Sequence, residues 1–328
     1  MKRNLILALL LLTFSMVSVG CLKKMADRQD QKAGKESLEK YGPMEDYGAK
    51  VDNEIFDVPY AEGLEDDHWL VADVFYIDHA NFQPMVINIH GGAWEIGDKS
   101  DVNSMFRSKY VAAHGYVVVN INYRLLPRHP VQTQIEDVMG AVIWAKENAM
   151  KFGGDARRVG VMGGSAGGHL ASMVAWASDD PFFTPTGHAD SRYDSDVKAA
   201  VLFYGVYDFE DRLTRFPRDK KTGLGGIAHR YFTGMKKGPE RDELFRHVSP
   251  KYHIDSAIPP SYFVCGDEDN FHLYSESVLY SEKVAEAGVP TGLYTAEGAV
   301  HGFDRDYGAD YSVEALEKTV EWFDTYLR

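Results

Sequence analysis

The sequence predicts an α/β fold in which a mostly parallel, twisted sheet carries helices on both faces. Two observations lead to this prediction. Short apolar runs rich in Val and Ile alternate with longer segments of helical periodicity along most of the chain. In addition, the 328 residues are 45% hydrophobic, which is enough to fill a substantial core. The sequence shows no internal repeat and no inter-domain linker, so we expect one folded domain over residues 51–328.

The expected elements follow one another in a regular order. Two edge strands are expected at 55–60 and 70–76, and further strands at 85–89, 116–121, 159–162, 199–204, 262–265 and 292–296. Helices are expected at 102–114, 132–151, 166–177 and 275–287. A final helix has an apolar face formed by Val313, Leu316, Val320, Phe323 and Leu327. Because strands and helices alternate, the central strands should be parallel.

Residues 1–20 have the pattern of a signal peptide. Lys2 and Arg3 precede an apolar run over 5–19, which is shorter than the roughly 20 residues that span a bilayer. Small residues then precede Cys21, as in the lipobox of bacterial lipoproteins, where the cysteine is acylated. We therefore expect export and a lipid anchor on Cys21, with the protein held on a membrane at the periplasmic side or the cell surface. The alternative is an ordinary signal peptide followed by a chance cysteine.

The segment 21–50 is expected to be a lipidated N-terminus followed by a flexible tether, because most of its residues are charged or small. The second cysteine, Cys265, lies in an apolar run and is expected to be buried and inert. With lipid on Cys21, no disulfide can form within the chain.

The charge balance restricts the partners. The formal net charge is −14. Of the 35 basic side chains, Lys2 and Arg3 would leave with the signal peptide, so 33 would face 49 acidic ones, a net charge of about −16. This excess makes nucleic acid an unsuitable partner and disfavours polyanionic substrates. We expect no metal and no cofactor, and the sequence does not indicate an oligomeric state.

Ser165 lies in a Gly-x-Ser-x-Gly pattern with Gly163 and Gly167. An apolar run precedes it and a helical segment follows, so the chain is expected to turn sharply from strand to helix at this serine. Such a turn projects the hydroxyl clear of the backbone, and small neighbours are needed because strand and helix approach closely. The pattern alone is weak, since a plain glycine-rich turn has the same letters.

A second glycine-rich turn, His90-Gly91-Gly92-Ala93-Trp94, follows the strand at 85–89. Two glycines after a buried strand let successive N–H groups point at one spot, as in an oxyanion hole. A Gly-Gly sequence by itself is more often only a turn.

Acyl transfer by serine also needs a base and a carboxylate that orients it. His301 follows the strand at 292–296, and Asp267 and Asp269 both follow the strand at 262–265. Ligands of open α/β sheets bind at the carboxyl ends of the strands, so these groups should lie close to Ser165. The order serine, acid, histidine is the one found in α/β-hydrolases.

From residue 86 to 327 the sequence resembles the α/β-hydrolase carboxylesterases of the hormone-sensitive-lipase-like and bacterial acetyl- and feruloyl-esterase-like group. Five motifs in family order carry the resemblance: His90 to Trp94, Asn122 to Leu125 with Pro127, His129 and Pro130, Gly163 to Gly168, Gly266 to Asp269, and His301 to Phe303. The resemblance implies an α/β-hydrolase fold. It also implies that Ser165 is the nucleophile and His301 the general base.

The family resemblance also implies the remaining roles. The N–H groups of Gly92, Ala93 and Ala166 would form the oxyanion hole, while His90 would shape the turn without titrating in catalysis. The family's Gly-x-x-Asp pattern selects Asp269 as the acid. Asp267 is the second candidate, and Asp208, after the preceding strand, is the third. The remaining histidines considered as bases, expected instead to be surface or loop residues, are His247, His253 and His272.

Two features bear on substrate choice. The sequence departs from the family's common His-Gly-Gly-Gly motif at Ala93 and Trp94; alanine still donates its N–H, and the indole of Trp94 is expected to bind substrate and narrow the acyl pocket. Over 206–260, strand signals fade and aromatic and charged residues mix. We expect a cap-like insertion that forms a substrate wall there, or else a solvated surface excursion.

The function expected from these residues is hydrolysis of carboxylic esters through an acyl-enzyme on Ser165. Short acyl groups such as acetyl are the expected substrates, with carbohydrate as a candidate carrier. Two alternatives remain open at this point: an aminopeptidase or formamidase on the same fold, and a catalytically silent hydrolase-like binding protein at the surface of the cell.

Overall fold

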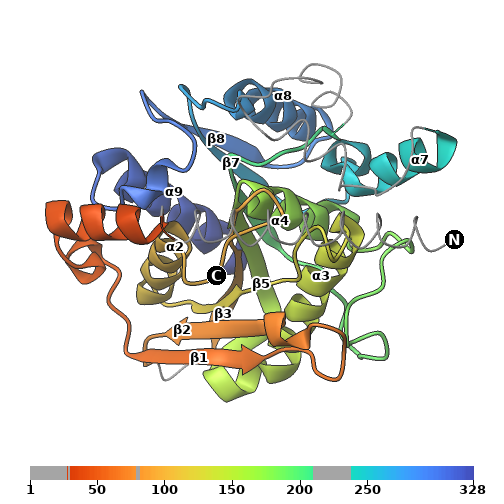
Figure 1. The fold of residues 1–328 in the computed structure, drawn as a ribbon, viewed down its shortest axis with the longest axis horizontal. Coiled ribbons are helices and arrows are strands. Elements are labelled where there is room, and N and C mark those ends of the chain that lie inside the picture. Colours follow the sequence, from red (N-terminus) through yellow and green to blue (C-terminus); the bar gives the residue numbers. More distant parts are fainter. Residues whose placement is uncertain (1–27, 29, 79–81, 210–237) are drawn as a thin grey trace, which may run out of the picture.

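An eight-stranded sheet in the order β1-β2-β4-β3-β5-β6-β7-β8 forms the centre of the part of the chain that the structure describes (Figure 1). The structure is a computed structural model and describes residues 28, 30–78, 82–209 and 238–328. In sheet order, the strands are β1 (Asn53–Pro59), β2 (Val71–Tyr76), β4 (Val117–Ile121), β3 (Gln83–Ile89), β5 (Gly154–Gly164), β6 (Ala199–Phe203), β7 (Ser261–Gly266) and β8 (Thr291–Ala296).

The six strands from β4 to β8 run parallel, whereas β1 and β2 are antiparallel. The predicted parallel α/β sheet is therefore confirmed. The parallel strands read as continuous apolar runs because helices cover both faces of the sheet; every residue of β4, for example, is buried. One expectation was wrong: the strand at 70–76 is not an edge strand, since β2 pairs with β1 on one side and β4 on the other.

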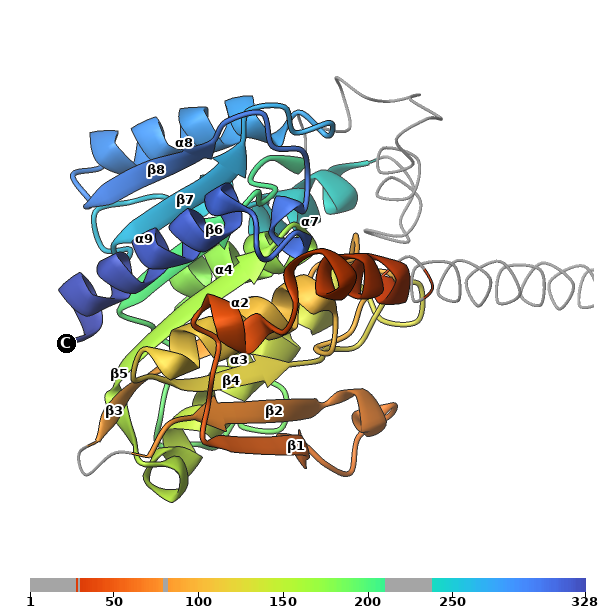
Figure 2. The ribbon, with the colours of Figure 1, turned by 90° about the vertical axis from the view of Figure 1, so that its left-hand side faces the viewer.

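Helices cover the two faces of the sheet in separate groups. Figures 1 and 2 show α2 (Val102–Ala113) and α9 (Asp310–Leu327) on one face, in mutual contact. On the other face, α3 (Val131–Asn148) contacts α4 (Ala166–Ala177). The remaining α-helices with defined bounds are α8 (Leu273–Glu286), which packs on β7 and β8, and α7 (Pro239–Val248).

The sheet brings the predicted functional loops to one edge. The turn at 90–94 follows β3, and Ser165 follows β5. Asp269 follows β7, and His301 follows β8. Since these four strands are parallel, all four loops leave from the same edge, which is where ligands of open α/β sheets bind.

The predicted flexible tether is wrong for the described part of 21–50. Residues 30–41 form a helix, and a 3-10 turn follows at Met44–Tyr47. Several contacts hold this segment on the domain. Asp30 Oδ2 accepts from the N–H of Val102 at 3.2 Å, where α2 begins. Ser37, 6% exposed, donates to the carbonyl of Arg305 at 2.9 Å.

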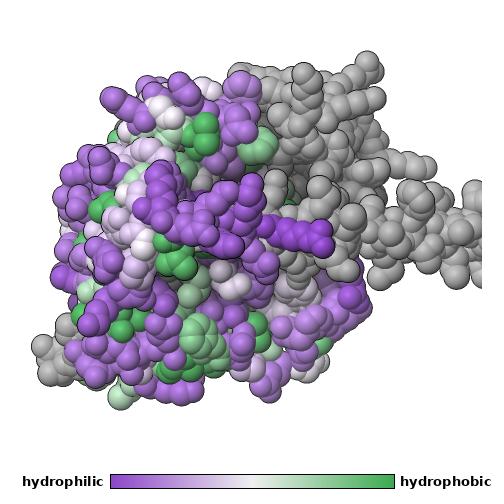
Figure 3. All heavy atoms as spheres, turned by 60° about the vertical axis from the view of Figure 1, so that its left-hand side comes forward, coloured by the Kyte–Doolittle hydropathy of each residue, from purple (hydrophilic) through white to green (hydrophobic). Residues whose placement is uncertain are grey.

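The composition of this helix explains why its structure was missed. Its outward face carries the charged side chains, including exposed i,i+4 pairs of Lys32 with Glu36 and of Lys35 with Glu39. Figure 3 shows it as a hydrophilic surface across the middle of the view. The residues of the inward face recur at helical spacing, but most of them are small or polar: Asp30, Ala33, Gly34, Ser37 and Tyr41. No apolar stripe is therefore visible in the sequence.

The signal peptide and Cys21 lie outside the described residues, as does 210–237 of the expected substrate wall. In the described part of that wall, α7 and a 3-10 turn at Pro250–His253 agree with the expected helical or irregular structure. No helix among the described residues is long and apolar enough to cross a membrane.

The contact at Gly34 gives a test of the docked helix. A Cβ on Gly34 would lie 2.5 Å from Val102 Cγ2, so Gly34→Leu should displace the helix. We expect limited proteolysis within residues 30–50 to become at least about fivefold faster, because cleavage follows the population of the open form. The matched control is Lys35→Leu on the exposed face, which should leave the rate unchanged. Equal rates in Gly34→Leu and the wild type would contradict the docking.

Candidate active site

Ser165 occupies a strained turn between β5 and α4. Its backbone has φ 58° and ψ −118°, a region that residues with side chains rarely adopt. The N–H of Ser165 donates to the carbonyl of Phe203 at 3.0 Å, which ties the turn to the end of β6. The predicted strand-turn-helix is therefore confirmed.

The glycines on either side of this serine allow an approach that no other residue would permit. A Cβ on Gly163 would lie 2.4 Å from the carbonyl oxygen of Gly167. A Cβ on Gly167 would lie 2.2 Å from the carbonyl oxygen of Ile89, at the end of β3. The first turn of α4 therefore packs directly on the backbone of two strands, as the sequence pattern predicts.

His301 bridges Ser165 and Asp269. Its Nε2 lies 2.9 Å from Ser165 Oγ, and its Nδ1 lies 2.7 Å from Asp269 Oδ2. The imidazole also packs against the rings of Tyr204 and Phe271, each with its centroid 4.7 Å away, at interplanar angles of 62° and 86°. The three side chains thus form the hydrogen-bonded series that a serine nucleophile and its base require.

Asp269 is held as a carboxylate. Burial would raise its pKa, but the hydrogen bond and charge of His301 and two backbone donors outweigh this effect, so the pKa lies below its usual value. The backbone donors are the N–H groups of Phe271 at 2.8 Å and Leu273 at 3.4 Å, both to Oδ1. An ionised Asp269 fixes the orientation of His301 and stabilises its charged form.

The competing acids lie elsewhere. Asp267 is exposed and accepts from the N–H of Gly298 at 2.6 Å. Asp208 pairs with the ammonium of Lys251 at 2.9 Å. The geometry therefore selects Asp269, as the Gly-x-x-Asp pattern implies.

Two of the other histidines considered as bases, His247 and His253, bind groups other than Ser165, and the third, His272, is exposed in a loop as expected. His247 Nδ1 lies 2.9 Å from Asp180 Oδ2, and His253 Nε2 lies 2.8 Å from the carbonyl oxygen of His247. His272 precedes α8 with a left-handed backbone. Cys265 is buried as expected, and burial raises the pKa of its thiol.

The turn after β3 lies beside Ser165, since a Cβ on Gly91 would be 3.3 Å from Ser165 Cβ. The turn after β3 has positive φ at Gly92 (117°), Ala93 (51°) and Trp94 (63°), which directs its N–H groups away from strand pairing. Ala166 is the first residue of α4, where N–H groups have no partner in the helix. No hydrogen bond within the described residues uses the N–H of Gly92, Ala93 or Ala166. These three donors are thus available for an oxyanion.

The position of Trp94 does not support a direct substrate contact. The side chain is 3% exposed, and its Nε1 donates to His169 Nδ1 at 3.1 Å. The ring packs against Phe209, with the centroids 5.3 Å apart. The indole is therefore enclosed among other side chains, with His169 and Phe209 as neighbours.

One group of residues escaped the sequence analysis. Arg107 and Asp304, both fully buried, form an ion pair beneath the site, and Tyr204 Oη donates to Asp304 Oδ1 at 2.5 Å. The ring of Tyr204 contacts His301, so the pair supports the base from below. A signal existed: Arg107 lies on the inward face of a predicted helix, where a charge needs a buried partner.

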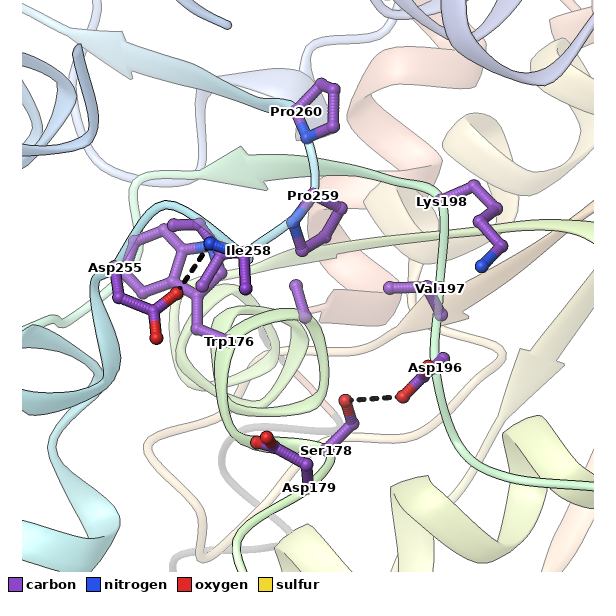
Figure 4. Close-up of a pocket in the computed structure, with 12 residues that line it drawn as sticks. Trp176, Ser178, Asp179, Asp196, Val197, Lys198, Asp255, Ile258, Pro259 and Pro260 are labelled. Atoms are coloured by element: carbon purple, nitrogen blue, oxygen red, sulfur yellow. Dashed lines mark hydrogen bonds between the residues drawn. The ribbon is translucent and has the colours of Figure 1, made fainter. Parts of the chain in front are cut away.

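Another pocket, of about 430 Å³, lies at the opposite edge of the sheet (Figure 4). It is bordered by Lys198 before β6, Pro260 before β7 and Ser178 after α4. Within its lining, Ser178 Oγ donates to Asp196 Oδ1 at 2.9 Å. Ser165, which follows β5 at the other edge of the sheet, is not among the residues that line this pocket. The described residues contain no group of three or more His, Cys, Asp or Glu that could hold a metal ion.

Comparison with known proteins decides the family. The family model BD-FAE matches residues 73–284. The chain belongs to the BD-FAE family. Esterase LipQ of Mycobacterium tuberculosis is 32% identical over 80% of this chain and 59% of LipQ. Esterase LipC of the same organism is 32% identical over 69% of this chain and 54% of LipC. The chain thus spans a little over half the length of these curated relatives.

Solved structures confirm the α/β-hydrolase fold of this BD-FAE member. Esterase B from Lactobacillus rhamnosis superposes with a TM-score of 0.74 at 20% identity, over 94% of this chain and 96% of that chain. A truncated carbohydrate esterase from gut microbiota superposes with a TM-score of 0.69 at 20% identity, over 84% and 96%.

The choice between the two aspartates can be tested directly. Asp269→Asn should lower kcat by about 10³- to 10⁴-fold, because the amide cannot hold His301 in the required tautomer. Asp267→Asn removes a carboxylate from the same loop and should leave kcat within about twofold of the wild type. Ester hydrolysis measured for both purified variants gives the answer. A larger loss in Asp267→Asn would reverse the assignment.

Proposed function

We propose that this chain is a serine esterase that hydrolyses carboxylic esters. The observation that carries the proposal is the hydrogen-bonded series from Ser165 Oγ through His301 to Asp269 Oδ2. Further support comes from the relatives of the chain, which include LipQ, LipC and a probable carboxylic ester hydrolase, LipM, of Mycobacterium tuberculosis.

In this proposal, Ser165 Oγ attacks the ester carbonyl while its proton passes to Nε2 of His301. The negative charge that develops on the carbonyl oxygen is stabilised by N–H groups of the turn at 90–94 and of Ala166. The positive end of the α4 dipole adds to this stabilisation. Ionised Asp269 stabilises the imidazolium of His301 during the attack.

His301 then gives its proton to the leaving alcohol, and the acyl group remains on Ser165. Water attacks this acyl-enzyme with His301 again acting as base, which releases the acid and restores the serine. Removal of one oxyanion donor from such a site costs about 3 kcal/mol in the barrier. The three donors therefore carry a large part of the expected rate.

We further propose short acyl groups, acetyl above all, carried on carbohydrate as the substrates. Support for carbohydrate comes from the likeness to the gut carbohydrate esterase, which is a likeness of fold. A panel of acetylated xylan, feruloyl ester, aryl ester, N-formyl amide and peptide amide separates this substrate class from the formamidase and aminopeptidase alternatives. Turnover of an amide in preference to every ester would contradict the esterase proposal and favour the formamidase or the aminopeptidase.

The nucleophile is tested by Ser165→Ala. Hydrolysis of a short p-nitrophenyl ester should fall by a factor on the order of 10⁶, because no other group can form the acyl-enzyme. Labelling by a fluorophosphonate probe should disappear in the same variant. The matched control is Ser178→Ala, at the far end of α4. This variant should keep both ester hydrolysis and fluorophosphonate labelling. A wild-type chain that is never labelled would indicate a silent binding protein.

We also propose that the chain is an exported lipoprotein anchored through Cys21. The support is the signal-like sequence over 1–20 and the small residues before the cysteine. Cys21→Ser should move the protein from the membrane fraction to the soluble fraction of exporting cells, without changing its kcat. The neighbouring control Lys24→Ser should stay with the membrane. A membrane-bound Cys21→Ser protein would contradict acylation at this residue.

A further inference from the structure

The turn that carries two of the proposed oxyanion donors has an unfavourable backbone. Ala93 and Trp94 are consecutive residues with side chains, and both have left-handed φ values, of 51° and 63°. Such conformations persist only where the surrounding structure holds them in place. The contacts that hold this turn therefore also determine where the N–H groups of Gly92 and Ala93 point.

Trp94 is the residue through which the turn is held. Its carbonyl oxygen accepts from the N–H of Leu126 and from Gln134 Nε2, each at 2.9 Å. At the other end of the residue, the indole Nε1 donates to His169 Nδ1 at 3.1 Å. Both the backbone and the side chain of Trp94 are thus attached to neighbouring elements.

His169 connects this turn to the nucleophile. It lies one helical turn after Ser165 on α4, and its N–H donates to the carbonyl of Ser165 at 3.0 Å. Its Nε2 lies 2.9 Å from the carbonyl oxygen of Val248, which can only accept, so Nε2 carries the proton. Nδ1 is then the bare acceptor that the indole of Trp94 requires.

The environment of His169 keeps it in this form. The side chain is fully buried, and burial lowers its pKa to about 3. The imidazole therefore stays neutral at the pH values at which an esterase works. A protonated ring would present a second N–H to Trp94 and break the contact.

We propose that the hydrogen bond from Trp94 to His169 positions the oxyanion hole relative to the nucleophile. This inference rests on the proposed esterase function. Both residues are positioning residues: neither is required to touch the substrate. Because His169 lies in the first turn of α4 and its N–H binds the carbonyl of Ser165, which precedes that helix, the bond sets the distance between the serine oxygen and the N–H groups of Gly92 and Ala93.

The first experiment removes the indole N–H and retains an aromatic ring. In Trp94→Phe we expect kcat for a p-nitrophenyl ester to fall about tenfold, with KM changed by less than about twofold. Trp176, a buried tryptophan on α4, is a matched control. Its indole N–H donates to Ser261 Oγ at 3.0 Å beside the pocket of Figure 4. Trp176→Phe should leave kcat unchanged even where it lowers the melting temperature.

The second experiment varies the acceptor. In His169→Asn, the amide oxygen can occupy the place of Nδ1, and kcat should stay within about threefold of the wild type. In His169→Leu the acceptor is lost, and kcat should fall about tenfold. The double variant Trp94→Phe/His169→Leu should be no slower than the worse single variant, because both changes remove one interaction.

A third readout reports on the oxyanion alone. When Ser165 Oγ adds to a trifluoromethyl ketone, its proton passes to His301 and the ketone oxygen becomes an oxyanion. The inhibition constant should rise in Trp94→Phe by about the factor by which kcat/KM falls. Inhibition by the corresponding alcohol, which forms no oxyanion, should not change. A role confined to folding would not separate the two inhibitors.

The outcomes distinguish this inference from the proposed function. If the wild type hydrolyses esters and Trp94→Phe keeps full kcat, or if Trp176→Phe loses as much, the positioning role is wrong and the esterase stands. If the wild type neither hydrolyses any ester nor reacts with a fluorophosphonate, both the esterase function and the positioning role are wrong. If one variant does not fold, the remaining member of the pair Trp94→Phe and His169→Leu decides.

Discussion

The structure of the site depends on one close approach, that of the first turn of α4 to the ends of β3 and β5. Gly163 and Gly167 leave no room for a Cβ between these backbones. As a result, Ser165 adopts a strained backbone with positive φ and its hydroxyl projects from the turn. The same approach places the N–H of Ala166, at the positive end of the helix, beside the turn at 90–94. The positions of the proposed nucleophile and the proposed oxyanion donors thus follow from a single packing constraint.

The sequence predicted those parts of the site that local chemistry determines. Ser165 and the turn at 90–94 were identifiable because glycine is required where backbones touch, and His301 because it follows a strand of the same sheet. Asp269 could not be separated from Asp267 by this reasoning, since both follow β7 within three residues. In the fold, the chain curls so that Asp269 faces inward and receives the N–H groups of Phe271 and Leu273. The family pattern alone pointed to Asp269, the aspartate that lies beside His301 in the fold.

Two parts of the molecule were hidden for a different reason. The helix at 30–41 docks through small and polar residues, so hydrophobic periodicity does not reveal it. Its contacts join residues far apart in the chain, such as Ser37 and Arg305. The buried pair of Arg107 and Asp304 likewise joins α2 to the loop after His301. In both cases the information lies in which distant residues meet, and a local pattern carries none of it.

Two buried titratable residues support the active site in opposite charge states. Asp269 is buried, but it accepts hydrogen bonds from His301, from the N–H groups of Phe271 and Leu273 and, at 4.0 Å, from the thiol of Cys265, so its carboxylate is favoured. His169 is also buried, but its neighbours are an indole N–H and a carbonyl oxygen, which match only a neutral ring. Burial alone would make both groups neutral. The difference lies in the hydrogen-bond partners: donors surround Asp269, whereas the ring of His169 meets the N–H of Trp94 on one nitrogen and the carbonyl oxygen of Val248 on the other. The fold therefore selects each charge state by where it places backbone N–H and C=O groups.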